Sequence, residues 1–214
     1  MSASNTIQTP TYNTRSKADI VLDAARTVFL SYGFSDATTD MIQKKAGVSK
    51  STVYAHYKNK EALFIAVIES ECKNYAKQIR KIQFSPGKLK ETLTAMAHEY
   101  LNVVLSPTAL SLHKIIISEG TRFPSLANTF YNEGPQAIIS IVSEILSNAK
   151  KRQELTLTDT TLSEAAKVFI HLVRSEPQLS NLMHPNTPPT KDEINRWVVV
   201  SVNSFLLAFE KNNA

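Results

Sequence analysis

The chain has 214 residues, of which 43% are hydrophobic and 20% charged, and it carries a net charge of +5 and one cysteine. This composition is typical of a globular protein with one or two small domains and a substantial core. A single cysteine excludes an internal disulfide framework, and the apolar runs are too short for a transmembrane helix. The N-terminal residues contain no hydrophobic signal segment, so we expect a cytoplasmic protein with no membrane partner.

The chain opens with a polar segment, residues 1–14, which lacks periodicity and is expected to be a flexible tail. Ser16 and Asp19 then predict the start of a first helix, because their side chains can bond the N–H groups that a first turn leaves without partners. Apolar residues recur at helical spacing from there until Gly33, which ends the pattern.

Two short helices joined by a tight turn are predicted next. Thr38 is placed to cap the first, over about residues 39–46, and Gly47 tolerates the left-handed turn that must follow it. Ser49 is placed to cap the second, over about residues 50–57. This arrangement is a helix-turn-helix, whose second helix can enter the major groove of DNA.

The outward face of that second helix carries hydrogen-bond donors and small side chains, which suit base edges and phosphates. These residues are Lys50, Ser51, Thr52, Tyr54, Ala55 and His56. The segment 15–60 holds eight Lys or Arg residues against four Asp, a local excess that favours a polyanionic partner. An ordinary helical hairpin with a solvated polar face would show the same pattern of turns and caps.

The segment from about residue 20 to 69 resembles the DNA-binding domain of TetR/AcrR-family transcriptional regulators. The resemblance is carried by LDAARTVFLSYGF at 22–34 and AGVSKSTVYAHYKNKEALF at 46–64, with Ile42 between them. Asp40 departs from the family, in which some members are basic at this position, and its carboxylate would repel a phosphate.

The resemblance, carried over position by position, implies a DNA-binding set. Lys50, Ser51 and Tyr54 would approach bases. Phosphates would be held by Thr39, Thr52, His56 and Lys60. The set is completed by Ser49, Ala55 and Tyr57.

A long helix is predicted from about residue 60 to 81, which would connect the helix-turn-helix to a second domain. Further helices are expected, separated by proline or polar breaks. They span residues 89–105, 107–118, 125–132, 134–151, 159–174 and 191–210. We therefore expect an all-α fold, with an N-terminal three-helix DNA-binding domain over 15–62 and a C-terminal helical ligand-binding and dimerisation domain over 63–214.

The piece HKIIISEGTRFPSLANTFYNEGP, at 113–135, resembles the C-terminal regulatory domain of the AefR-like branch of the same family. Helical domains of this size enclose an apolar pocket with a few polar groups. Candidate lining residues are the polar-tipped or soft side chains in the middle of the domain, most of which we expect to be core packing. They are Met96, Tyr100, His113, Phe130, Tyr131 and His171.

The last two helices are apolar around much of their circumference, which a single chain would struggle to bury. Their apolar residues include Leu162, Ala166, Phe169, Ile170, Val173, Ile194, Trp197, Val198, Val202, Phe205 and Leu206. A strip of small residues, Ser201, Ser204 and Ala208, would also allow close helix approach. We predict a homodimer through these helices, since two recognition helices must match two half-sites of DNA. The alternative is that they form the buried centre of a monomer.

Motifs of catalysis and metal binding are missing from the sequence. The five histidines form no HExxH motif, and there is no CxxC pair, Gly-rich phosphate loop or nucleophile elbow. We therefore expect no enzyme, no metal and no cofactor. The predicted function is a sequence-specific repressor that a small-molecule effector releases from a double-stranded DNA operator. The alternatives are a transcriptional activator, or a sensor that keeps the fold without specific DNA binding.

Overall fold

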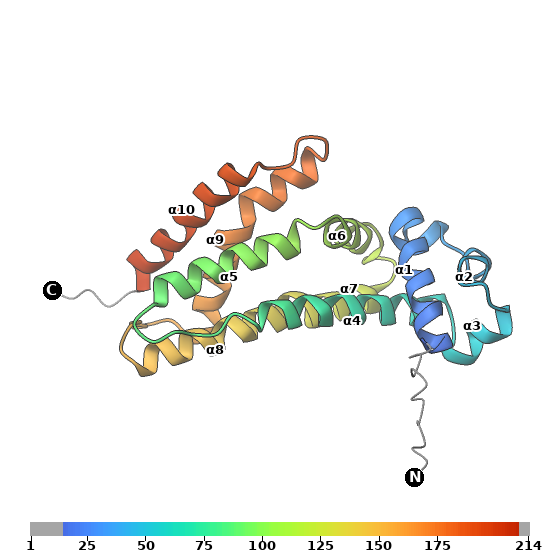
Figure 1. The fold of residues 1–214 in the computed structure, drawn as a ribbon, viewed down its shortest axis with the longest axis horizontal. Helices are drawn as coiled ribbons and strands as arrows, with labels where there is room; N and C mark the ends of the chain where they lie inside the picture. The colour runs from blue at the N-terminus through green and yellow to red at the C-terminus, as the bar shows by residue number, and fades with distance from the viewer. Residues whose placement is uncertain (1–14, 210–214) are drawn as a thin grey trace, which may run out of the picture.

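The computed structural model describes residues 15–209, and the expected tail at 1–14 lies outside them. The described chain is all-α, with a small helical unit at one end and a long bundle at the other (Figure 1). The helices are α1 (Lys17–Asp36), α2 (Thr39–Ala46), α3 (Lys50–His56), α4 (Lys60–Ile79), α5 (Leu89–Val104), α6 (Pro107–Glu119), α7 (Pro124–Tyr131), α8 (Ala137–Lys151), α9 (Leu162–Met183) and α10 (Lys191–Phe209).

The caps predicted for the first three helices are confirmed. Ser16 and Asp19 form a reciprocal capping box at the start of α1, and the Thr38 hydroxyl accepts the N–H of Met41 at 3.1 Å. Gly47 ends α2 with φ +65°, a left-handed conformation that a side chain would strain. The order of helix, turn and helix is therefore set by short-range contacts that the local sequence provides.

An aromatic cluster joins the small unit to the rest of the molecule. The ring centroids of Phe29, Phe34 and Phe64 lie 4.6 to 5.9 Å apart, and Phe123 approaches Phe34 at 4.7 Å. The first three come from α1 and α4, whereas Phe123 directly precedes α7. Helix α4 continues from this cluster into the bundle, where Ile79 packs in a second apolar core (Figure 1). One helix thus contributes side chains to both apolar cores.

The expected break between a helix at 125–132 and another at 134–151 is wrong. Residues Asn132–Gln136 form a single π-helical turn that connects α7 to α8 without interruption. In the wider π turn, Pro135 lies inside the helix and the Ala137 N–H bonds the Gly134 carbonyl. Such π turns are rare and occur often beside functional sites.

The expected end of the ninth helix at Arg174 is also wrong, because α9 continues through Pro177 to Met183. A proline inside a helix leaves the carbonyl four residues earlier without its usual N–H partner. Here the indole N–H of Trp197 donates to the carbonyls of Leu172 and Val173 at 3.1 and 2.9 Å, and Ser201 Oγ donates to Leu172 at 3.1 Å. At the Val173 carbonyl, Trp197 of α10 therefore replaces the backbone bond that Pro177 removes.

Within residues 15–209, no single helix has the length and hydropathy needed to cross a membrane. Helices α5 and α6 meet the test only when taken together, and they are bent by 65° at the break between them.

Candidate DNA interface and ligand cavity

Helix α3 exposes the face that the sequence predicts for DNA. Tyr54 is 45% exposed. Exposed side chains are also found at Lys50, Ser51, Ala55 and His56. Val53 on the opposite face is fully buried and anchors the helix to the core of the small unit. The predicted donors thus stand outward on a helix whose other side is fixed by apolar packing.

The start of α3 is organised by Ser49. Its hydroxyl accepts the N–H of Thr52 at 3.2 Å and lies 2.8 and 2.9 Å from the hydroxyls of Ser51 and Thr52. Three hydroxyl groups are therefore gathered at the N-terminus of the helix. Such groups, with the free N–H groups there, are suitable partners for a phosphate.

Two polar contacts tie α2 to the exposed face of α3. Lys50 Nζ lies 2.9 Å from Asp40 Oδ1, and the Tyr54 hydroxyl lies 3.3 Å from Thr39 Oγ1. The hydrogen bond to Asp40, together with its charge, raises the pKa of Lys50. The carboxylate that would repel a phosphate is therefore paired with a lysine, and two of the predicted base-contacting side chains have fixed starting positions.

Lys60 has a structural role in the described chain. Its ammonium donates to the carbonyls of Phe34, Ser35 and Ala37 at 2.8, 3.1 and 3.0 Å, and lies 4.6 Å from the centre of the Phe34 ring. An ammonium has three N–H donors, so these three contacts use all of them. Lys60 closes the C-terminus of α1, and a phosphate contact for it stays a prediction.

The other residues of the predicted DNA-binding set differ in exposure. Thr39 and Thr52 are partly buried, and Tyr57 turns inward, where its hydroxyl donates to the Ala18 carbonyl at 3.4 Å. Burial is the main cause of the raised pKa of Tyr57. The exposed part of the set therefore centres on the start and outer face of α3.

The bundle contains a small, partly open cavity of about 70 Å³ among α4, α5, α6, α7, the π turn, α8 and α9. Three of the six predicted lining residues, Tyr100, His113 and Phe130, lie on its wall. The other three do not line it: Met96 is fully buried in the neighbouring core, whereas Tyr131 and His171 are exposed. The cavity is also lined by Cys72, Tyr75, Arg174 and Gln178, and by apolar residues such as Val103, Leu112 and Ile138.

Arg174 and Gln178 were missed by sequence reasoning, although a signal for them exists. They lie one turn apart on α9, in line with the buried residues Phe169, Ile170 and Val173. A cation that interrupts an apolar helical stripe indicates a polar cavity wall. The expectation that α9 would end at Arg174 hid this pattern.

The ionisable groups of the cavity wall are shifted towards their neutral forms. Burial raises the pKa of Tyr100, and the nearby Arg174 opposes this through its charge and a hydrogen bond. Burial lowers the pKa of His113, and the charge of Arg174 adds to the effect. Burial, followed by the charges of Glu133 and Glu71, raises the pKa of the Cys72 thiol to about 12. At neutral pH the wall therefore presents two phenols, Tyr75 and Tyr100, with a neutral imidazole, a thiol and one guanidinium.

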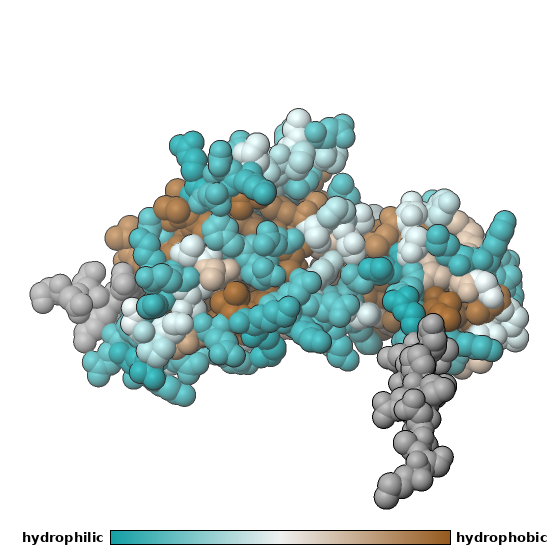
Figure 2. Space-filling view, viewed as in Figure 1, coloured by the Kyte–Doolittle hydropathy of each residue, from teal (hydrophilic) through white to brown (hydrophobic). Residues whose placement is uncertain are grey.

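The last two helices leave apolar side chains exposed, but not those named from the sequence. Phe169, Val173, Val202 and Phe205 are buried within the protomer, so the argument that they need a partner chain is wrong. A different set faces solvent: Val168, Leu179, Met183, Val199, Val200 and Leu207. Apolar surface is visible over the region of α5, α9 and α10 (Figure 2).

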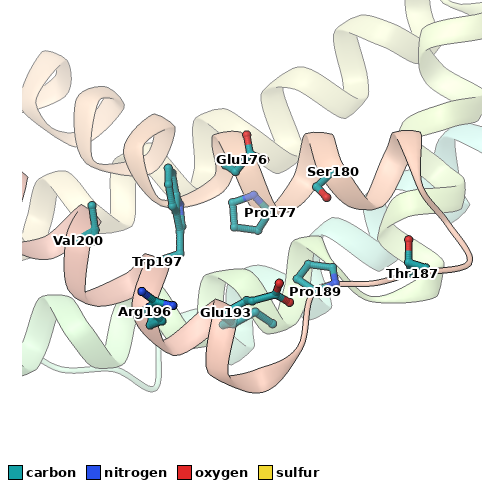
Figure 3. Close-up of a pocket in the computed structure, with 10 residues that line it drawn as sticks. Glu176, Pro177, Ser180, Thr187, Pro189, Glu193, Arg196, Trp197 and Val200 are labelled. Carbon is teal, nitrogen blue, oxygen red and sulfur yellow. The ribbon is translucent and has the colours of Figure 1, made fainter.

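A surface groove lies between the second half of α9 and the start of α10, with a volume of about 390 Å³. Trp197, Pro177 and Pro189 project into it, and Glu176, Glu193 and Arg196 stand along its rim (Figure 3). Among residues 15–209, no group of three or more His, Cys, Asp or Glu side chains is arranged to hold a metal ion.

A helix-turn-helix joined by one long helix to a helical bundle defines a class of DNA-binding protein. Residues 21–67 match the model of the bacterial regulatory proteins of the tetR family, and residues 91–211 match the C-terminal domain of AefR-like transcriptional repressors. The chain belongs to the TetR family. It is a DNA-binding transcriptional regulator and not an enzyme.

Individual relatives agree with this assignment. The chain is 28% identical to the HTH-type transcriptional regulator SrpR of Pseudomonas putida over 154 residues, which are 72% of this chain and 70% of SrpR. It is 35% identical to the solved structure of the flavonoid-responsive regulator FrrA, with a TM-score of 0.79 over 92% of this chain and 98% of that one. A TetR-family regulator from Mesorhizobium loti, 23% identical, shares the fold with a TM-score of 0.83 over 91% of this chain and 97% of that chain.

Proposed function

We propose that the protein is a homodimeric repressor that leaves its operator when a small-molecule effector occupies the bundle cavity. TetR-family regulators bind DNA operators and usually act as homodimers. The observation that carries the proposal is the position of α4, which begins with Lys60 at the base of the helix-turn-helix and presents Cys72 and Tyr75 to the cavity. An effector pressed against those two side chains acts on the same helix that supports α1.

The DNA-binding face in this proposal is the start and outer side of α3. Lys50, Ser51 and Tyr54 approach base edges, whereas Ser49, Thr52 and His56 hold phosphates. The contact of Thr39 with the Tyr54 hydroxyl supports this role, because it orients the tyrosine before DNA arrives. As the place of action we propose the cytoplasm, where a bacterial chromosome is accessible.

The dimer interface in this proposal is the exposed apolar face of α9 and α10. Leu207 is 85% exposed, and Val199, Val200, Leu179 and Met183 are each more than half exposed. Solvent contact of this much apolar surface on two neighbouring helices is unfavourable for a monomer. We expect Val200→Glu to convert the dimer to a monomer in analytical ultracentrifugation, whereas Ile117→Glu, at an exposed site on α6, leaves the dimer intact. A dimeric Val200→Glu protein would place the interface elsewhere.

The effector in this proposal is an aromatic compound with polar substituents. Flat or ring-bearing walls, formed by Tyr75, Tyr100, His113 and Phe130, surround the cavity. FrrA, which is 35% identical over 92% of this chain, is named a flavonoid-responsive regulator. Flavonoids are therefore the first compounds to test as effectors.

A contact between α1 and α4 supports the coupling between cavity and DNA face. Glu71 is 7% exposed, and its Oε1 lies 3.4 Å from Nη1 of Arg26 in α1. The charge of Glu71 also reaches Tyr75, one turn further along α4, and Tyr75 lines the cavity. Displacement of Tyr75 by an effector therefore acts beside the ion pair that holds α1 against α4. Since a ligand shifts an equilibrium only through differential affinity, the effector must bind best to the arrangement with altered α1 and α4 packing.

The test is a mobility-shift titration on DNA from upstream of the protein's own gene, at two salt concentrations and against random competitor DNA. We expect specific retention that weakens with salt, and release when a flavonoid panel is added. Retention without release by any member of the panel would refute that effector class but leave the operator function standing. Retention no stronger than on random DNA would favour the sensor without specific DNA binding. Transcription with and without the protein separates repressor from activator.

A further inference from the structure

The wall of the bundle cavity includes a cation, Arg174, that forms no ion pair within residues 15–209. Arg174, near the middle of α9, is partly buried and lines the cavity wall. Its guanidinium lies near Tyr100 of α5, His113 of α6 and His171 of α9, since its charge lowers the pKa of each. The guanidinium thus stands where three helices meet at the cavity.

Among residues 15–209, no carboxylate forms an ion pair with this guanidinium. Four ion pairs are found within residues 15–209, and none includes Arg174. The side chains that line the cavity include no Asp or Glu. Moving a cation out of water without an anionic partner is costly, and buried charges in proteins are therefore paired or bind ligands. The cavity is built so that an incoming negative charge would be stabilised.

The groups around Arg174 suit an anion attached to an aromatic body. Tyr100, neutral His113 and Gln178 supply further hydrogen-bond donors, and the guanidinium fork matches a carboxylate or phenolate oxygen. Leu112, Phe130 and Val103 provide apolar wall for the remainder of the molecule. We propose that the effector is an aromatic organic anion, a carboxylate or an acidic phenol, whose negative charge binds Arg174.

This inference rests on the proposed function, because it names the chemistry of the effector of that same cavity. The cavity volume of about 70 Å³ is far below the roughly 300 Å³ that drug-sized ligands need. The described arrangement is therefore too small for such a ligand, and the anion binds an opened form in which the helices around Arg174 have separated. Ligand entry and the change in bundle packing are then one event, as release from an operator requires.

The test compares acids with neutral amides of the same shape. Binding of benzoate, 2-naphthoate and biphenyl-4-carboxylate to the full chain is measured by calorimetry beside benzamide, 2-naphthamide and biphenyl-4-carboxamide. For at least one pair we expect the acid to bind about tenfold or more tightly than the amide. Arg174→Gln should weaken the acid about 10- to 100-fold and leave the amide unchanged. Arg174→Lys should retain part of the preference, and Arg152→Gln, at an exposed arginine, should retain all of it.

The stability of the unliganded variants separates a ligand-binding arginine from a structural one. Arg174→Gln removes an uncompensated charge, so its thermal unfolding midpoint should equal or exceed that of the wild type. A lower midpoint together with unchanged acid affinity would overturn the proposal. It is also overturned if each amide binds as tightly as its acid, or if none of the six compounds binds. If Arg174→Gln does not fold, the ratio of acid to amide affinity in Arg174→Lys decides instead. A ratio equal to that of the wild type would show that the two-pronged hydrogen bonding of the Arg174 guanidinium is not what binds the acid.

The same compounds in the mobility-shift titration distinguish this proposal from the gating function. Release of DNA by an acid but not by its amide supports both. An acid that binds through Arg174 without releasing DNA supports the charge preference and refutes effector gating. Release by the amide alone supports gating and overturns the charge preference.

Discussion

The DNA-binding face and the ligand cavity are built in opposite ways. The side chains at the start of α3 are exposed and are positioned by partners close in sequence, such as Ser49 with Thr52 and Asp40 with Lys50. The cavity wall is partly or fully buried, and Cys72, Tyr100 and Arg174 reach it from three helices far apart in the chain. A surface that recognises DNA needs hydrogen-bond donors that face solvent. A cavity that holds a small molecule needs side chains that converge from several helices and exclude water.

The difference implies that removing a buried ring from the cavity wall lowers stability, whereas changes at the exposed proposed DNA face affect binding alone. The largest effect should come from Tyr100→Ala, because Tyr100 is 3% exposed and its loss leaves a void beside Arg174. We expect the free energy of unfolding to fall by about 3–5 kcal/mol in urea denaturation. Tyr100→Phe keeps the ring and should cost well under half as much. Equal losses for the two variants would assign the stability to the hydroxyl and its contact with Arg174.

Tyr54→Ala should have the next largest effect, and on DNA binding only. Tyr54 is 45% exposed, so its removal should leave the unfolding free energy within about 0.5 kcal/mol of wild type. Operator affinity should fall on the order of 100-fold, because a dimer loses the contact twice. The matched control is Tyr32→Ala, at an exposed tyrosine on α1, which should bind the operator normally. Undiminished binding by Tyr54→Ala would remove Tyr54 from the interface.

Lys60→Met tests whether Lys60 stabilises the fold or contacts a DNA phosphate. The methionine keeps an apolar stem but loses three hydrogen bonds to the end of α1, so we expect a loss of about 1–3 kcal/mol in unfolding free energy. Lys58→Met, at an exposed neighbour, should leave stability unchanged and reduce the salt dependence of DNA binding. A Lys60→Met protein with wild-type stability and a smaller salt slope would support the phosphate contact instead.

Asp40→Asn should have a smaller effect, in the direction of tighter binding. The substitution removes a negative charge from the DNA-binding face and frees the Lys50 ammonium. We expect affinity for all DNA sequences to rise about two- to tenfold at low salt, as measured by fluorescence anisotropy. Asp36→Asn, at an exposed residue of α1, is the control. Loss of discrimination at a single base pair would show instead that Asp40 accepts a hydrogen bond from a base.

The smallest effect at neutral pH concerns Cys72 on the cavity wall. Its folded-state pKa of about 12 lies above the ordinary value of 9.0, so its stabilising contribution is complete below pH 9 and is lost as pH rises towards 12. Compared with Cys72→Ala, the wild type should lose stability over that interval. Iodoacetamide should alkylate the native thiol much more slowly than the urea-unfolded one. Equal rates would show that the wall opens freely to solvent.

The sequence predicts the helices and caps of the helix-turn-helix well because this structure is local. Caps at Ser16, Thr38 and Ser49, and the left-handed Gly47, act within four residues of their own position. The cavity could be predicted only in part, because its wall depends on packing between distant helices. Tyr100 and His113 were identifiable as polar-tipped residues in the middle of the domain, whereas Met96 of the same description packs in the core.

The two wrong helix boundaries have the same cause. Proline is a strong local signal to end a helix. At Pro177 the signal is overruled by Trp197, which lies 24 residues beyond Val173, and at Pro135 by a π turn. Neither compensation is visible in the neighbouring sequence.

The bond between Trp197 and the Val173 carbonyl gives the protein an intrinsic optical probe. Trp197 is the one tryptophan among 214 residues, so its emission reports on a single place. Its indole N–H donates a hydrogen bond to the Val173 carbonyl, immediately before Arg174. Its ring borders the groove between α9 and α10. In the proposed mechanism an effector in the cavity contacts Arg174 of α9, and the proposed dimer through α9 and α10 would cover the groove. Both events should therefore shift the emission of an unlabelled sample, and stopped-flow fluorescence can give the order in which they occur.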